Sequence, residues 1–364
     1  MRSILWLPLI SVVLAGQTTG DADLLKLTRE LRRAVGEDSP SSAVDLADRL
    51  DDAVQQRYKA WLIRDADERA NEVLTWLPPD IEAFWVNMEP FTIKPEETVG
   101  LLYGRPIQAY SMDRLMAVNG GSFYKALAGH TARLVVSAAR KIGERKGIPG
   151  IAGSEEVAYF YFLAHPADLP SFDDSVQGHP VWRATAKVFV DGPLQPGVEP
   201  AQREDESWIA LGRPDLLILS NRRDMLAQIL VQMTGGSRSR ALPAGLPEWA
   251  HVNRTASFWG LRHYSPQSKP SRDQRGYDVA ELPRPDGAAT GVAVQFDYAK
   301  QRLEIDYLSP SRLSEVPIFA NSRKREFQTD QPGAGVWRLI SDVQARGDFP
   351  VHFAMTMLGF GAYR

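Results

Sequence analysis

Three carboxylates, Asp297, Glu304 and Asp306, are the acidic side chains whose spacing best suits acid–base chemistry. They alternate with apolar residues in two neighbouring runs, 292–298 and 303–307. If these runs pair as a hairpin, the carboxylates share one face, from which a glycoside hydrolase could draw its acid and base. The other interpretation of the same pattern is a solvent-facing sheet surface.

A second candidate site combines aromatic and cationic residues near the start of the last third of the chain. The pattern predicts a strand over 256–264, on which Arg262 and Tyr264 face the same way. With Trp249 nearby, they would form a surface suited to a carboxylate, a sugar or a peptide. The alternative is that they are ordinary covering of a sheet surface.

Several kinds of chemistry lack their motifs. The chain has no cysteine, which excludes disulfides, thiolate metal sites and cysteine nucleophiles. No Gly-x-Ser-x-Gly elbow occurs, and no two of the six histidines stand at helical ligand spacing. The glycine-rich stretch 147–153 lacks the lysine and hydroxyl residue of a phosphate-binding loop. The sequence therefore predicts no catalytic residue, no metal and no cofactor.

Composition sets further limits on function. There are 42 basic and 45 acidic residues, for a formal net charge of −3, so the chain has no basic excess of the kind that nucleic-acid binding requires. Apolar residues make up 44% of the chain, enough to build a sizeable core. These numbers predict a folded protein that does not bind nucleic acid.

The first sixteen residues resemble a secretory leader. Arg2 precedes an apolar run over 4–14, and small residues follow at 15–16, the pattern of a signal peptide too short to span a bilayer. Gln17 stands where a lipoprotein would carry cysteine, so no lipid anchor and no transmembrane anchor is expected after cleavage. We expect a periplasmic or secreted bacterial protein. The alternative is a buried amino-terminal helix or strand.

The rest of the chain predicts an α+β fold, mostly antiparallel, after a helical amino-terminal segment. Helical periodicity covers 23–35 and a longer stretch that begins after Ser39-Pro40-Ser41-Ser42 and stops at Pro78-Pro79. The expected divisions are a signal peptide (1–16), a helical segment (17–76), an α+β domain (77–243) and a second α+β portion (244–364). Further helices are expected near 112–118, 223–233 and 336–345.

An internal duplication is one interpretation of the two α+β portions. Leu77-Pro78 precedes Phe84-Trp85, and Leu246-Pro247 precedes Phe258-Trp259. The correspondence does not continue at constant offset, so independent use of similar strand composition is the other interpretation.

Two stretches carry a resemblance to known sequences. The first joins Leu246-Pro247-Glu248-Trp249 to the segment 258–264, and the second joins Trp208-Ile209-Ala210 to 216–221 ahead of a helix. They resemble parts of uncharacterised exported bacterial proteins with duplicated α+β domains of unknown function. The resemblance implies an α+β envelope protein and supplies no active site.

Together these features predict an exported, non-catalytic binding or scaffolding protein of the bacterial envelope. Its partner would be an envelope ligand or protein that the sequence does not specify, and its amino-terminal helices are one expected contact. The alternative is an extracytoplasmic hydrolase whose catalytic carboxylates are dispersed in the sequence.

Overall fold

A computed structural model describes most of the elements expected from the sequence. It covers residues 19–37, 39–92, 130–141, 155–167, 174–189, 202–235, 239–263, 290–308 and 328–342. The chain divides into two compact units, Met1–Asp65 and Ala66–Arg364. The expected leader, Tyr264 and the helix expected near 112–118 lie outside the described residues. No helix in these ranges is both long enough and apolar enough to cross a membrane.

The first unit contains helix α2 (Thr19–Gly36) and most of α3 (Pro40–Trp76). The backbone N–H of Ser39 donates to the carbonyl of Ala34, which closes the turn between the helices. Both helices agree with the periodicity of the sequence. Pro40 is the first residue of α3, where the missing N–H of proline costs nothing.

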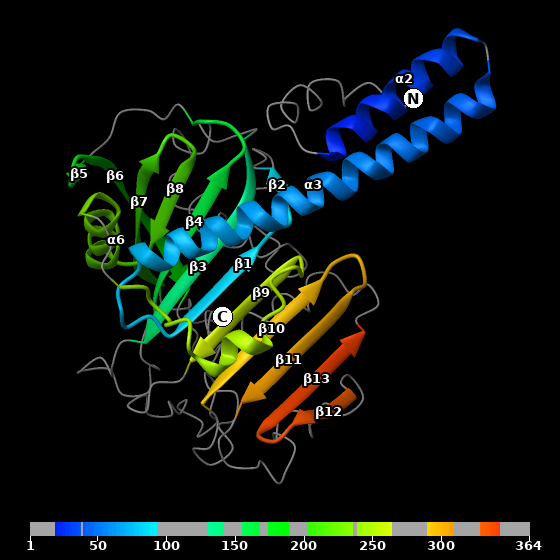
Figure 1. The fold of residues 1–364 in the computed structure, drawn as a ribbon. Coiled ribbons are helices and arrows are strands. Elements are labelled where there is room, and N and C mark those ends of the chain that lie inside the picture. The colour runs from blue at the N-terminus through cyan, green and yellow to red at the C-terminus, as the bar shows by residue number, and fades with distance from the viewer. Residues whose placement is uncertain are drawn as a thin grey trace, which may run out of the picture. The chain divides into compact units, whose positions relative to one another are not determined.

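The second unit is built on one antiparallel sheet of thirteen described strands (Figure 1). The strands follow the order β12-β13-β11-β10-β9-β1-β3-β4-β8-β7-β6-β5, with β2 paired to β3. Their bounds are β1 (Ala83–Asn87), β2 (Phe91–Thr92), β3 (Thr131–Lys141), β4 (Glu155–Leu163), β5 (Asp174–Val176), β6 (His179–Phe189), β7 (Gln202–Arg213), β8 (Leu216–Ser220), β9 (Phe258–His263), β10 (Gly291–Asp297), β11 (Arg302–Leu308), β12 (Gln328–Gly333) and β13 (Val336–Asp342). The expected α+β class with mostly antiparallel pairing is confirmed.

Helices cover one face of this sheet, which we call the helical face (Figure 1). In the last turns of α3, Ala66, Ala70 and Val73 are fully buried, and the Trp76 ring lies 6.2 Å from that of Phe160 on β4. Helix α6 (Arg223–Gly235) packs against β4, β7 and β8. The short 3₁₀ helix η1 (Pro247–His251) lies over β9, β10 and β11.

The two α+β portions expected from the sequence share this single sheet. Strand β1 pairs with β9 in the register Ala83↔Arg262 to Asn87↔Phe258, so the sheet is continuous across the expected boundary at 243–244. From this junction the order β1-β3-β4-β8-β7 runs one way and β9-β10-β11-β13-β12 runs the other. The strand order is thus repeated, as an internal duplication requires.

The Phe-Trp dipeptides that suggested the duplication do not occupy equivalent positions. Phe84 contacts Trp259, with ring centroids 6.1 Å apart, whereas Trp85 contacts Phe258 at 5.5 Å. Because neighbouring residues alternate between faces, Phe84 and Phe258 point to opposite sides of the sheet. A duplication must therefore include a one-residue shift between the two copies at this strand.

The helix expected over 336–345 was wrong, because residues 336–342 form strand β13. This strand pairs with β11 along its whole length, from Val336↔Leu308 to Asp342↔Arg302. Trp337 and Leu339 alternate with Arg338 and Ile340, which is the period of a strand. A partner strand distant in sequence therefore outweighed the local helical pattern.

Candidate binding site

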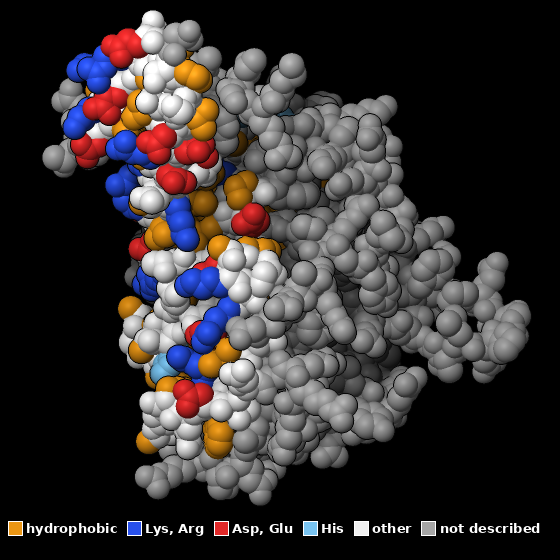
Figure 2. All heavy atoms as spheres, turned by 90° about the vertical axis from the view of Figure 1, so that its right-hand side faces the viewer, with side chains coloured by type: hydrophobic (Ala, Val, Ile, Leu, Met, Phe, Trp, Pro, Cys, Tyr) orange, Lys and Arg blue, Asp and Glu red, His pale blue; other side chains and the backbone are white. Residues whose placement is uncertain are grey.

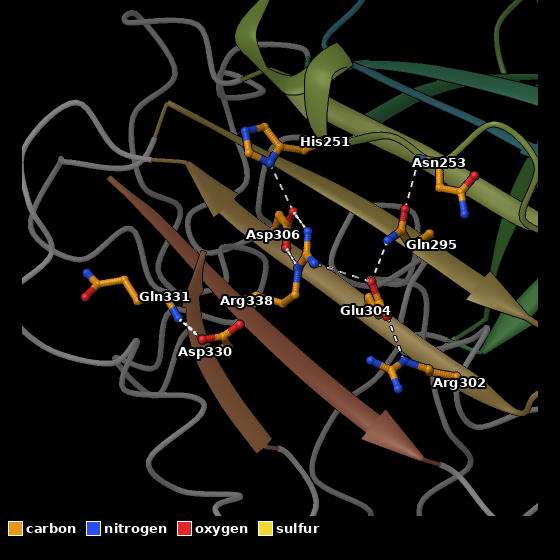
Figure 3. Close-up of polar contacts among 9 residues, drawn as sticks. All are labelled: His251, Asn253, Gln295, Arg302, Glu304, Asp306, Asp330, Gln331 and Arg338. Carbon is orange, nitrogen blue, oxygen red and sulfur yellow. Dashed lines mark hydrogen bonds and ion pairs between the residues drawn. The ribbon is translucent and has the colours of Figure 1, made fainter. Parts of the chain in front are cut away.

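The predicted hairpin is present, but its polar face is not the solvated surface that its pattern also suggested. Strands β10 and β11 pair from Gly291↔Leu308 to Asp297↔Arg302. Asp306 is only 2% exposed, beneath η1 and beside Arg338 of β13 (Figure 3). Asp297 instead accepts the backbone N–H groups of Ala299 and Lys300 and so stabilises the hairpin turn.

Asp306 is held by an arginine and a histidine. Arg338 donates through Nε to Oδ1 and through Nη2 to Oδ2, both at 2.7 Å, and His251 Nδ1 lies 3.1 Å from Oδ2 (Figure 3). The hydrogen bonds to Asp306 hold the pKa of Arg338 above its ordinary value, although burial acts in the opposite direction. A two-pronged pair of this kind fixes both side chains in one geometry.

Glu304 belongs to the same network, and both of its carboxylate oxygens also accept hydrogen bonds. Arg302 Nε and Gln295 Nε2 each donate to it at 2.7 Å, and Gln295 in turn accepts the backbone N–H of Asn253 (Figure 3). Burial alone would raise the pKa of Glu304, but the bonds from Arg302 and Gln295 outweigh it and lower the pKa. Glu304 is therefore a stable anion and a poor proton donor near neutral pH.

A second carboxylate–imidazole pair lies where η1 meets β9. Glu248 is completely buried, and its Oε1 lies 3.0 Å from Nδ1 of His263, whose side chain is 33% exposed. Gly291 of β10 makes room for the carboxyl group, because a Cβ at this position would overlap it. This pair was not predicted from the sequence. Glu248 and His263 lie in separate elements, η1 and β9, and meet only when these elements pack together.

The Glu248–His263 pair predicts that stability falls as the pH rises. The hydrogen bond that His263 donates to the Glu248 carboxylate raises the pKa of His263, against the effect of burial. Its contribution is therefore fully present below the unfolded-state pKa of about 6.5 and is lost as the pH rises through the higher folded-state pKa. We expect urea unfolding to show a larger stability difference between the protein and Glu248→Gln at pH 6 than at pH 8.5. An equal difference at both pH values would contradict this assignment.

The predicted binding residues Trp249 and Arg262 are not brought together. Arg262 is 5% exposed and lies on the face of β9 opposite to Trp259. The Trp249 ring contacts Trp259 and Phe84, so it lies on the helical face. Tyr264 is outside the described residues, so only its predicted place beside Arg262 stays a prediction.

Trp249 instead forms a cluster with two other arginines, which we call the Trp249 cluster: Arg240, Trp249, Arg254 and Asp67. The guanidinium carbons of Arg240 and Arg254 lie 4.8 and 4.7 Å from the centre of the Trp249 ring. Arg254 donates to Asp67 near the end of α3 at 2.6 Å. Only Trp249 was a candidate from the sequence, because Asp67 is remote in the chain and no pattern indicated that Arg240 and Arg254 would lie over the ring.

The described residues show no candidate metal site. Within them, no group of three or more His, Cys, Asp or Glu residues is arranged to hold a metal ion. Two surface hollows lie beside the turn between α2 and α3, one of them lined by the exposed pair Asp45–Arg49. Basic and acidic side chains interleave on the part of the surface coloured in Figure 2.

These features define an α+β protein built on one large antiparallel sheet, with buried ion pairs under its helical face. The chain matches no protein-family model, no curated protein and no solved structure.

Proposed function

We propose that this protein is an exported, non-catalytic binding or scaffolding protein of the bacterial envelope. The observation that carries the proposal is that both hairpin carboxylates are already bound within the protein. Asp306 accepts from Arg338 and contacts His251. Glu304 accepts from Arg302 and Gln295. These acids were the leading catalytic candidates. Carboxylates neutralised in this way stabilise a sheet but do not exchange protons with a substrate.

The leader pattern of residues 1–16 supports the location. Export of a cysteine-free chain requires no disulfide chemistry outside the cytoplasm, and the fold depends instead on a large apolar core. The Trp249 cluster supports a binding role, since aromatic and arginine side chains are frequent anchors of recognition.

The proposal is tested by expressing the full chain in a bacterial host and fractionating the cells. We expect the protein in the periplasm or medium with its amino terminus at residue 16 or 17. The purified protein should bind at least one of three probes saturably in calorimetry: peptidoglycan fragments, anionic phospholipid vesicles or an envelope extract. Recovery in the cytoplasm with Met1 attached, or no binding to any probe, would contradict the proposal.

The alternative is an extracytoplasmic hydrolase, favoured by one specific observation. His263 and His251 each face a buried carboxylate through Nδ1, which leaves Nε2 free to act as a base. Assays of turnover with ester and glycoside substrates distinguish a hydrolase from a binding protein. Turnover that disappears in His263→Ala or His251→Ala, with the fold intact by circular dichroism, would favour the hydrolase, whereas no turnover is expected from a binding protein.

A further inference from the structure

Arg240 is the unusual member of the Trp249 cluster. Its Nε and Nη2 atoms are shielded from solvent and have no hydrogen-bond partner among the described residues. Arg338 and Arg254, by contrast, each donate to a carboxylate. Buried guanidinium donors without acceptors are costly, and their presence in a folded protein points to an acceptor that comes from elsewhere.

The charge around Arg240 points to the same kind of partner. Arg240 and Arg254 both lie over the Trp249 ring, and Asp67, the neighbouring carboxylate, is bonded to Arg254 alone of the two. Burial lowers the pKa of Arg240, and the neighbouring positive charge of Arg254 lowers it further. Two cations against one anion leave one positive charge to be neutralised, so a singly charged anion fits the cluster.

The two Arg240 atoms that lack acceptors determine which shape of anion fits them. Nε and Nη2 lie on the same edge of a guanidinium group and donate in parallel. That edge matches two oxygens of a carboxylate or a phosphodiester, whereas a lysine ammonium offers no such fork. Both anions carry one charge at neutral pH.

The surroundings hold the cluster in place. Trp249 Nε1 lies 3.2 Å from the carbonyl of Leu242 and 3.1 Å from that of Pro243. The backbone N–H of Ala241, next to Arg240, donates to the carbonyl of Leu74 in α3 at 2.9 Å. A rotamer change of the Arg240 side chain, of the kind common on binding, would turn its donor edge outward.

We propose that the Trp249 cluster is an anion-binding site in which Arg240 and Arg254 receive a carboxylate or phosphodiester group of the ligand. This inference deepens the proposed binding function and rests on it for the source of the anion. The geometry of Arg240 does not depend on that function, so the two proposals can fail separately.

The site is tested by titrating the purified full chain with acetate, with dimethyl phosphate and with phosphatidylglycerol vesicles. The indole N–H resonance of Trp249, assigned with Trp249→Phe, reports binding at the ring that the two arginines share. We expect a saturable shift with at least one probe. Response to the small anions identifies a free ligand group, and response to vesicles alone identifies a lipid headgroup.

Variants of Arg240 provide the decisive comparison. Arg240→Ala should weaken binding at least tenfold, and Arg240→Lys should weaken it several-fold because the charge remains but the fork is lost. The matched control is Arg223→Ala, since Arg223 also lies over a tryptophan, Trp208, but is already paired with Asp174. Its affinity should equal that of the unaltered protein.

A stability measurement keeps the test valid if a variant folds poorly. In anion-free buffer Arg240→Leu should melt at a higher temperature than the unaltered protein, because an unsatisfied charge has been removed. Addition of the bound anion should raise the melting temperature of the unaltered protein but not of Arg240→Leu. No shift of the Trp249 resonance, or equal weakening in Arg240→Ala and Arg223→Ala, would overturn the site. Envelope binding that persists in Arg240→Ala would overturn the site alone and leave the proposed function standing.

Discussion

Gly291→Ala is expected to lower the free energy of unfolding by about 3 kcal/mol. The added Cβ would occupy the space of the Glu248 carboxyl group, which is completely buried and so has no open side into which to move. Relieving the overlap requires the carboxylate to leave His263 or β10 to shift within the sheet. Chemical denaturation followed by tryptophan fluorescence measures the loss.

Gly245→Ala is the matched control for this prediction. It makes the same chemical change in the loop before η1, where an added Cβ would meet nothing within 4 Å. Its unfolding midpoint should equal that of the unaltered protein. A small effect of Gly291→Ala, comparable with that of the control, would show that Glu248 does not fill this space.

Asp306→Asn is expected to lower the free energy of unfolding by about 2 kcal/mol. The amide keeps the shape of the carboxylate but removes its charge and one of the two acceptors used by Arg338. The nearest remaining carboxylate, Glu304, lies 3.9 Å from Arg338 Nη1. We expect less than the full cost of breaking a buried pair because the Arg338 side chain is 28% exposed, and water partly screens its charge.

An exposed pair provides the comparison for Asp306. Asp174 accepts from Arg223 at 2.9 Å, but both side chains lie in solvent, so Asp174→Asn should leave the unfolding midpoint unchanged. A double-variant cycle between Asp306→Asn and Arg338→Gln then isolates the coupling of the buried pair. Additive effects in that cycle would show that the hydrogen bonds contribute little beyond the separate side chains.

Local patterns predicted the elements whose partners lie nearby. The hairpin of β10 and β11 was visible because its alternation and its turn fall within one short stretch. Helices α2, α3 and α6 were visible for the same reason. Strand β13 was predicted as a helix because residues 336–342 alone do not indicate that they pair with β11.

The pairing of β1 with β9 was beyond local patterns as well. The residues of β1 and β9 carry no local pattern that indicates their pairing, because the two strands are far apart in the chain. The sequence therefore left open whether the two portions share a sheet. The same limit applies to the site. Trp249 was identified from the sequence, but Asp67 is remote in the chain, and no pattern indicated that Arg240 and Arg254, nine and five residues away, would lie over its ring.

Arg262 shows a further limit of sequence patterns. Its position on one face of strand β9 was correctly deduced from alternation, yet that face was taken as exposed. In the structure β9 lies in the middle of the sheet and is buried on both faces over most of its length. Alternation fixes which side chains share a face, but burial depends on the position of the strand in the sheet.

The central junction of the sheet has a consequence for biosynthesis. About 170 residues separate the end of β1 from the start of β9, so β1 emerges long before the strand that completes it. At synthesis rates of 5–20 residues per second, an apolar strand keeps one unprotected hydrogen-bonding edge for about 10 to 30 s. During that interval the edge is open to pairing with other strands.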